Sequence, residues 1–302
     1  MFTTKDIYTK ACHESKDLHE MTEDERLRLQ AHLRKMYKDI EAVCDRHGLN
    51  VMLFAGSALG ALRHQGFIPW DDDIDLLMPR KDYEKLVKEY ASELPSNYKV
   101  YAPNCPNGAK SRFAKVVDTS TRFLGPDAED TPKNGIFVDI FVLENCPMSL
   151  RRAKLKRYVM LFLMLVSSAV QEYKGSGEMY KKLMCSTPQG KRTYKMRRFI
   201  GWFFSFLSED KWFNILDNVA RYDKETGYVN MPAIAPKMLF AVPHPYDIYF
   251  PAKRAKFDDI EAYVPSDLVQ HCEIMYGNWQ WIPPVEERWQ HFIKEIRFGE
   301  EN

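Results

Sequence analysis

The sequence has no excess of charge of either sign and no dense pattern of cysteines. Its 302 residues carry 43 Lys and Arg against 42 Asp and Glu, a formal net charge of +1. A chain this close to neutral has no overall field that would attract nucleic acid, so we expect no nucleic-acid partner. The six cysteines are scattered without a CxxC pair. This pattern indicates no dependence on disulfides and fits reduced thiols in the cytoplasm.

Long apolar runs are also missing. The longest, YVMLFLMLVSSAV at 158–170, has 13 residues, whereas a membrane-spanning helix needs about 20. Residues 1–17 lack the apolar segment of a secretory signal. We therefore expect neither a spanning helix nor a secretory leader in this sequence.

Apolar periodicity predicts helices and strands in the first half of the chain. Apolar residues recur at three- and four-residue steps through 24–47, which predicts a helix that ends at Gly48. Residues 81–94 predict a second amphipathic helix. Strands are predicted at VMLFAG (51–56), IDLLMP (74–79), YKVYA (98–102), RFAKVVD (112–118) and GIFVDIFVL (135–143). A mixed sheet with helices grouped around it predicts an α+β fold.

The composition changes at about residue 150. Residues 151–198 hold 13 Lys and Arg against two Glu, a net charge of +11 (13 − 2), beside the apolar run and the stretch RRFIGWFFSFL (197–207). We predict three parts, with N-terminal helices and the core in 1–150 and a basic, apolar helical insertion in 151–220. The third part, 221–302, is expected to pack on the core.

Two interpretations of the insertion are open. Its apolar run and aromatic residues fit a helical core, but beside so many basic residues they also fit contact with an anionic membrane. In the second case Phe199 and Trp202 would enter the lipid, and Arg197 and Arg198 would contact its charged surface.

The segment FIPWDDDIDLLMPR (67–80) has four carboxylates within five positions. Asp73 and Asp75 are separated by Ile74, and residues i and i+2 of a strand project from the same face. Two carboxylates on one face suit a hard cation such as Mg²⁺, which also takes oxygen ligands from water and substrate phosphates. A solvated acidic turn is the alternative, and it suits Asp71 and Asp72 best.

Two further features belong with this pair. In FAGSALGALRH (54–64), a strand ends at Gly56 and Ser57 and opens a helix, whose free backbone N–H groups suit a phosphate. Asp139 is a lone charge in the apolar strand pattern GIFVDIFVLE, and a buried carboxylate needs a metal or another cation beside it. Glu144 is the weaker candidate because it ends that strand, where water can reach it.

Several other polar residues have two interpretations each. Lys115 either neutralises a diphosphate oxygen or faces solvent from its strand. Arg63 and His64 either contact phosphate or stabilise the Asp-rich loop. His271 and Cys272 are adjacent, which is not the usual spacing of metal ligands, so we expect them to be structural.

These motifs together resemble a known family. Gly-Ser, an Asp-x-Asp strand and a third strand Asp are similar to the polymerase-β-like nucleotidyltransferase superfamily. More closely, AGSALGALRHQGFIPWDDDIDLLMPRKDYEKL (55–86) resembles the LicD family, relatives of the fukutin-related transferases. RFAKVVDTSTRF (112–123), GIFVDIFVLE (135–144) and FDDIEAYVPSDLVQHCEIMYGNW (257–279) are also similar to that family. The resemblance covers roughly 30–145 and 240–291, and His291 at its end is not assigned a catalytic role.

The resemblance implies a metal-dependent phosphotransferase with a polymerase-β-like nucleotidyltransferase core. It implies transfer of a phospho-alcohol, such as phosphocholine, from a CDP-activated donor onto a cell-surface glycan or lipid-linked saccharide, with Mg²⁺ or Mn²⁺ as cofactor. The site residues would be Asp73, Asp75 and Asp139 as catalytic metal ligands and Gly56, Ser57, Arg63 and Lys115 at the substrate phosphates. Such an enzyme is expected in the cytoplasm, at the inner face of the membrane if the insertion contacts lipid.

Two other classes of function stay open. A nucleotidyltransferase that acts on an NTP would use the same carboxylates but would release pyrophosphate rather than CMP. A non-catalytic binding protein could be built on the same core, although retention of all three aspartates argues against it.

Overall fold

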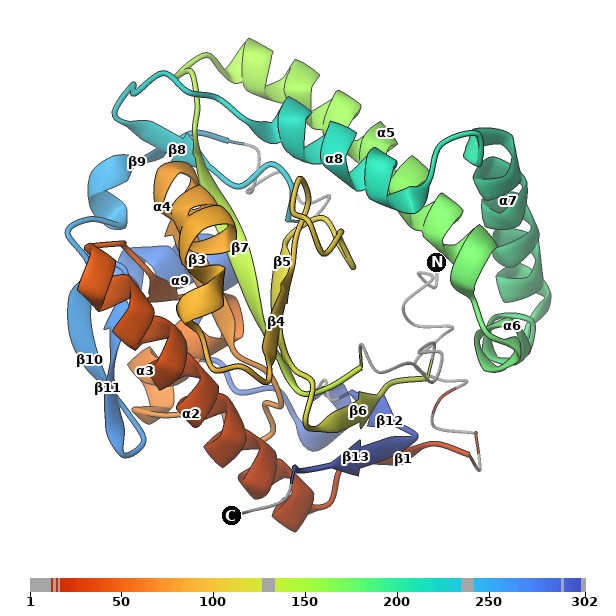
Figure 1. Ribbon diagram of the computed structural model, residues 1–302, viewed down its shortest axis with the longest axis horizontal. Coiled ribbons are helices and arrows are strands. Elements are labelled where there is room, and N and C mark those ends of the chain that lie inside the picture. Colours follow the sequence, from red (N-terminus) through yellow and green to blue (C-terminus); the bar gives the residue numbers. More distant parts are fainter. Residues whose placement is uncertain are drawn as a thin grey trace.

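The computed structural model describes residues 12, 15, 17–126, 134–234, 242–288 and 291–299. It is a mixed α+β fold whose main sheet has the strand order β2-β3-β7-β5-β4, with β8 and β9 added beyond the end of β7 (Figure 1). β3 and β7 are parallel, and the other pairs in this sheet are antiparallel. The strands are β2 (Met52–Leu53), β3 (Asp75–Pro79), β4 (Tyr98–Tyr101), β5 (Ala114–Asp118), β7 (Phe137–Asn145), β8 (Tyr228–Asn230) and β9 (His244–Pro245). All five predicted strands are confirmed, although the first ends at Leu53.

The predicted first helix is confirmed as α2 (Glu23–His47). The Thr22 side chain accepts a hydrogen bond from the backbone N–H of Glu25, whose carboxylate accepts one from the N–H of Thr22, so a capping box starts the helix. Gly48 ends it with a left-handed φ of 61°. The second predicted helix starts as α4 (Arg80–Lys85) and continues as a π-helical turn, Leu86–Tyr90, and a 3₁₀ turn, Ala91–Glu93.

The C-terminal residues return to the N-terminal half. β12 (Phe292–Ile293) pairs with β1 (His19–Glu20), and β13 (Glu295–Arg297) pairs with β6 (Arg122–Leu124). The hairpin of β10 (Lys253–Phe257) and β11 (Ile260–Val264) adds Phe257, Ala262 and Val264 to the main core. Other elements there are α9 (Leu268–Tyr276) and 3₁₀ turns at Tyr246–Ile248 and Val285–Glu287.

Residues 150–220 form a layer of helices, α5 (Leu150–Gly175), α6 (Glu178–Met184), α7 (Pro188–Phe204) and α8 (Glu209–Ala220) (Figure 1). This helical layer has an apolar cluster of its own, in which Met160, Leu163 and Val170 of α5 pack with Trp212 and Leu216 of α8. Across the parts of the chain that the structure describes, a helix long and apolar enough to cross a membrane is not found.

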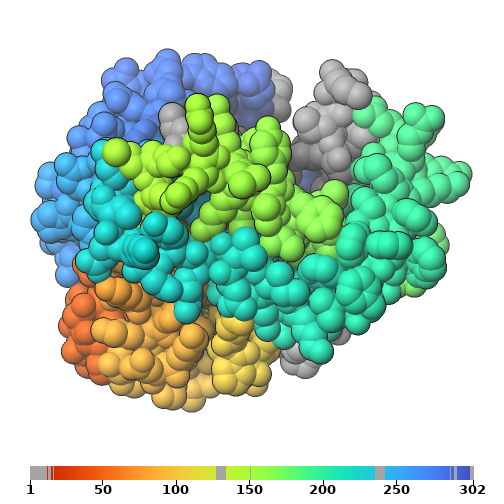
Figure 2. All heavy atoms as spheres, turned by 90° about the horizontal axis from the view of Figure 1, so that it is seen from above, coloured from red at the N-terminus to blue at the C-terminus, as the bar shows by residue number. Residues whose placement is uncertain are grey.

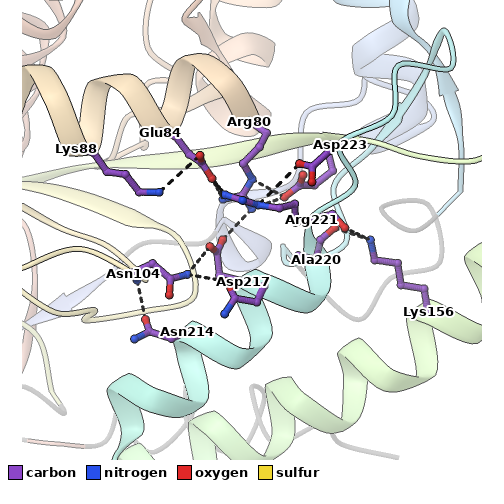
Figure 3. A network of polar contacts seen from close by, with 12 residues as sticks. Arg80, Glu84, Lys88, Asn104, Lys156, Asn214, Asp217, Ala220, Arg221 and Asp223 are labelled. Carbon is purple, nitrogen blue, oxygen red and sulfur yellow. Dashed lines mark hydrogen bonds and ion pairs between the residues drawn. The ribbon is translucent and has the colours of Figure 1, made fainter.

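A buried ion cluster joins the helical layer to the sheet (Figure 3). Arg80, the first residue of α4, donates hydrogen bonds to Glu144 of β7 and to Asp217 of α8, with an Nη2–Oδ1 distance of 2.8 Å to Asp217. All three side chains are buried. The expectation that water reaches Glu144 is therefore wrong, because a partner 64 residues away in the chain covers it.

We expect Arg80→Met to destabilise the protein by about 3–5 kcal/mol, because two carboxylates would be left buried without their cation. Equilibrium unfolding in urea measures this change. The neighbouring Lys81→Met is the matched control, since its ion pair with Glu225 is exposed on both sides and surface ion pairs contribute little to stability. Equal effects of the two substitutions would contradict the assignment.

His271 of α9 is a second buried polar residue, and it is not exposed to solvent at all. Its ring lies 5.6 Å from that of Phe54 and 5.8 Å from that of Tyr249, and neither ring nitrogen hydrogen-bonds to a described residue. Burial, together with the charge of His244, lowers the pKa of His271 to about 3. The imidazole is therefore packed as a neutral ring, which fits the structural role expected for it.

This burial predicts a pH dependence of stability. The unfolded chain takes up a proton at His271 below about pH 6.5, whereas the folded chain does so only near pH 3. The stabilisation is thus present above pH 6.5 and is lost as the pH falls, by about 2 kcal/mol at roughly pH 5. We expect His271→Leu to reduce the difference between the free energy of unfolding above pH 6.5 and that at roughly pH 5. An unchanged difference would show that another group causes it.

Candidate active site

Three charged side chains lie in one row across the centre of the main sheet. Asp75 on β3 is the register partner of Asp139 on the parallel strand β7, and Asp139 is in turn the partner of Lys115 on β5. Register partners project from the same face of a sheet. Lys115 Nζ lies 2.6 Å from Asp139 Oδ1, and both side chains are less than one-fifth exposed. Lys115 was expected either to neutralise a diphosphate oxygen or to face solvent. In the structure it neutralises a carboxylate of the candidate site, Asp139.

The turn from β2 into α3 (Ala55–His64) lies against this row. The hydroxyl of Ser57 accepts a hydrogen bond from the backbone N–H of Asp75 at 3.0 Å, so the turn fixes the start of β3. A Cβ atom on Gly56 would lie 3.1 Å from Asp71 Oδ2, which explains the small residue there. Ala55 has a φ of 45°, rare for a residue other than glycine, and makes the turn sharp.

The first turn of α3 has free donors. The side chain of the N-cap residue, Phe54, caps no backbone group, and the first turn contains no acidic residue. The first N–H groups of a helix lack intrahelical partners and attract negative charge. A phosphate oxygen fits this end of the helix, beside the carboxylates.

The carboxylates crowd one another enough to resist ionisation. Burial, followed by the charges of Asp73 and Asp139, holds the pKa of Asp75 well above its usual range. Burial also raises the pKa of Asp73 to about 6, where the charges of Asp72 and Asp139 add to it and that of His291 opposes it. Burial, followed by the charge of Asp73, also raises the pKa of Asp71. The buried Oδ2 of Asp71 accepts no hydrogen bond from the described residues.

Asp72 and His291 form a pair at the edge of this cluster. His291 donates its backbone N–H to Asp72 Oδ2 at 2.8 Å, and its Nδ1 lies 2.7 Å from Asp72 Oδ1. Burial lowers the pKa of His291, but the hydrogen bond and charge of Asp72, with the charge of Asp73, outweigh it and raise the pKa to about 9. Ligand atoms of Asp72, Asp73 and His291 all lie within 4.8 Å of one another.

The cluster fits a divalent cation, because it gathers more carboxylates than the cations beside them can neutralise. The predicted ligands Asp75 and Asp139 are neighbours in register, and the charge of Asp73 acts on Asp75. The three residues whose ligand atoms lie close enough to share one metal ion are Asp72, Asp73 and His291. Of the three predicted ligands, only Asp73 belongs to this group. Asp73 is therefore the residue common to both arrangements.

Asp72 and His291 are not among the residues that the sequence predicts for the site. The solvated turn that is the alternative for Asp72 is wrong, because the side chain is only 7% exposed. Its partner is 219 residues further along the chain, and no local spacing connects them. Tyr276 of α9 was also missed; burial, followed by the charges of Asp71 and Asp75, raises its pKa, so it lies near the cluster.

Arg63 and Trp70 hold the C-terminal loop beside the site. Arg63 donates from Nη1 to the backbone carbonyls of Trp279 at 3.0 Å and Trp281 at 2.8 Å, and from Nε to His64. Trp70 lies under the Arg288 guanidinium, 4.2 Å from the ring centroid. These contacts account for most of the Arg63 donors, and the proposed phosphate contact of Arg63 stays a prediction.

The fold and this cluster define a class, namely an α+β protein with a carboxylate-rich site next to an uncapped helix N-terminus. Comparison with known proteins relates part of the chain to a named family. Residues 48–153 match the family described as LicD/FKTN/FKRP, nucleotidyltransferase domain. This stretch contains α3, β3, β5 and β7, and with them Ser57, Asp73, Asp75, Lys115 and Asp139. This part of the chain is thus similar to the LicD family, the resemblance that the sequence motifs indicate.

Curated relatives are similar to the same part of the chain. The lipopolysaccharide cholinephosphotransferase LicD of Haemophilus influenzae is 34% identical over 107 residues, which is 35% of this chain and 39% of that protein. Uncharacterized proteins of Rickettsia prowazekii and Rickettsia typhi are each 36% identical over 50 residues, 17% of this chain. The match thus spans about two-fifths of the length of the H. influenzae relative.

Proposed function

We propose that this protein transfers a phospho-alcohol, phosphocholine or a similar group, from a CDP-activated donor onto a cell-surface glycan or lipid-linked saccharide. The observation that carries the proposal is the row of Asp75, Asp139 and Lys115 beside the uncapped start of α3. The name of the H. influenzae relative, a lipopolysaccharide cholinephosphotransferase, supports the choice of donor alcohol and acceptor.

We further propose that the core is a polymerase-β-like nucleotidyltransferase core. A Gly-Ser turn that opens α3, an Asp-x-Asp segment leading into β3, and a third Asp on the adjacent strand β7 support this assignment. In this scheme 1–150 hold the N-terminal helices and the catalytic core, 151–220 are a helical insertion, and 221–302 pack on the core. Contacts of Phe257, Ala262 and Val264 with the main core support the last assignment.

In the proposed reaction, an acceptor hydroxyl attacks the phosphorus that carries the alcohol, in line with the anhydride oxygen. A new O–P bond forms, the P–O bond of the diphosphate breaks, and CMP leaves with the electron pair. Asp139 accepts the hydroxyl proton and passes it to solvent. Such a reaction depends mainly on positioning and on neutralisation of charge.

The residues of the chain have separate tasks in this scheme. Asp73, Asp75 and Asp139 would hold Mg²⁺ or Mn²⁺, which neutralises charge on the donor diphosphate when bound. Burial raises the pKa of Asp139, and the charge of Lys115 opposes that shift. Ser57 fixes the backbone of Asp75, and the N–H groups at the start of α3 orient a phosphate. Six free cysteines suit a reducing compartment, and we place the reaction in the cytoplasm, in peripheral contact with an anionic membrane.

The decisive experiment incubates the protein with a panel of CDP-alcohols, a lipopolysaccharide or lipid-linked glycan fraction, and Mg²⁺. We expect release of CMP that depends on both donor and acceptor, and incorporation of the alcohol into the glycan. An NTP panel runs in parallel. Pyrophosphate release there, without CMP from any CDP-alcohol, would replace the proposal with a nucleotidyltransferase, and no turnover with either panel would indicate a binding protein.

We expect Asp73→Asn and Asp75→Asn each to lower turnover on the order of 100-fold or more, because each removes a charge from the cation site while nearly keeping its volume. The same substitutions should raise the free energy of unfolding in chelator, because each removes a buried charge and its repulsion by neighbouring carboxylates, the two causes that raise the carboxyl pKa values. Steady-state kinetics and urea unfolding measure the two effects. Asp223→Asn, an exposed carboxylate, is the control, and a folded Asp73 variant with full activity would refute the assignment.

A further inference from the structure

The helical layer presents large apolar side chains to solvent. Six of them, all between 50% and 69% exposed, define what we call the apolar band: Tyr158, Phe162, Phe199, Trp202, Phe203 and Phe206. Monomeric proteins rarely expose a contiguous apolar patch of this kind unless it contacts a partner or a membrane. Figure 2 looks onto the face where α5 (yellow-green) and α7 (blue-green) lie at the surface.

The apolar band is continuous across two helices. Trp202 and Phe203 lie three and four residues after Phe199, which places the three on one side of α7, and Phe206 follows two residues after the helix ends. The ring of Phe162 on α5 lies 5.7 Å from that of Phe204, whose ring in turn lies 5.0 Å from that of Phe203. The two apolar faces therefore meet.

Packing fixes this orientation of α7. Gly201 lies on the opposite side of the helix, where an added Cβ atom would come within 2.2 Å of the Ala169 carbonyl oxygen on α5. Arg197 pairs with Glu172, and Arg198 donates to the carbonyl of Tyr173 at 2.6 Å. Both arginines hold α7 on α5, so they are not the lipid contacts that the sequence suggested. The aromatic face is turned away from these contacts.

Basic side chains lie at both ends of the apolar band. Phe162 opposes Phe204 while Glu172 opposes Arg197, so α5 and α7 run antiparallel and their N-termini lie at opposite ends. Each N-terminal part carries three exposed basic residues, Arg151, Arg152 and Lys154 on α5 and Lys191, Arg192 and Lys195 on α7. Within the described ranges none of the six forms an ion pair.

Helix stability does not account for these positions. The N-terminus of a helix favours acidic side chains and disfavours basic ones, yet neither α5 nor α7 has an acidic residue in its first turn. Both helices depart from this preference in the same way, which indicates that the basic residues contact a partner.

We propose that the apolar band and its basic ends bind the surface of an anionic lipid bilayer, with the aromatic side chains at the headgroup boundary and the basic residues against the lipid charges. Aromatic residues flanked by Lys and Arg suit this environment. A second copy of the chain is a poorer occupant. Both ends of the apolar band are basic, so a two-fold contact would oppose like charges in either orientation. The inference deepens the proposed function, because a lipid-linked acceptor is presented at such a surface.

Co-sedimentation with phosphatidylcholine vesicles, with and without phosphatidylglycerol, tests the proposal in the full chain. We expect binding only to the anionic vesicles and weaker binding as salt rises. Each Lys or Arg near the surface contributes roughly a fivefold gain in partitioning. Arg192→Glu with Lys195→Glu should therefore lower the partition coefficient at least about 20-fold.

Two matched controls separate this surface from net charge alone. Lys253→Glu with Lys256→Glu makes the same change of charge at two exposed positions of β10, which lies on the other side of the molecule in Figure 1, and should leave most of the binding intact. Trp202→Ser with Phe203→Ser removes apolar insertion without a change of charge and should also weaken binding. Both substitutions lie at the surface, and circular dichroism checks the fold.

Three results would overturn the proposal: no binding of the wild type to anionic vesicles at low salt, equal losses in both charge-reversal variants, or a wild-type dimer in sedimentation velocity that Trp202→Ser with Phe203→Ser dissociates. Asp73→Asn should bind vesicles as the wild type does. Vesicle binding without CMP release would therefore refute the proposed reaction but support the membrane-binding surface. CMP release without vesicle binding would support the reaction but refute the membrane-binding surface.

Discussion

The parallel pairing of β3 with β7 is the interaction on which the rest of the structure depends. Alternate residues of these strands enter different cores, with Leu76 and Ile140 in the main cluster and Leu77 and Phe141 in the second. A slip of one residue would exchange these faces and move every side chain to the wrong side of the sheet. The same register that satisfies both cores places Asp75 beside Asp139. Burial of apolar surface therefore fixes the geometry of the carboxylates, which could not hold such a position by themselves.

The carboxylate cluster is unfavourable without a cation, and the surrounding structure offsets that cost. Burial disfavours the charged form of a carboxyl group, and neighbouring like charges add to this effect, which is why the pKa values of Asp71, Asp73 and Asp75 all lie above their usual range. The middle of β3 is fully buried, with Leu76, Leu77 and Met78 unexposed. Destabilised groups on a rigid apolar support are typical of functional sites rather than of structural ion pairs.

The sequence predicted the features that depend on local spacing and missed those that depend on distant partners. The strands and α2 follow from apolar periodicity and capping. The spacing of Asp73 and Asp75 predicts a shared strand face, and Asp139 stands out as a lone charge in an apolar strand pattern. The Asp72–His291 pair joins positions 219 residues apart, so nothing near Asp72 distinguished it from a solvated turn. The expectation for Glu144 is wrong for the same reason, because its cation and the carboxylate that shares it come from the start of α4 and from α8. Whether aromatic residues of a helix face a core or solvent likewise depends on contacts such as that of Gly201 with α5.

The Arg80 cluster connects the carboxylate cluster with the helical layer. It fixes the orientation of these parts more than it stabilises the protein. A buried ion pair often stabilises a protein no more than apolar residues of the same size would, but it tolerates only one arrangement of its partners. Arg80 follows directly after the strand that begins at Asp75, and Asp217 lies on α8, which packs on α5 through Trp212 and Leu216. The chain of contacts thus runs from the carboxylates along β3 to α8, and through α5 to the apolar band. Each step is a packed or ion-paired contact, so a bilayer bound at the apolar band would hold the carboxylate cluster at a defined distance and angle from its surface.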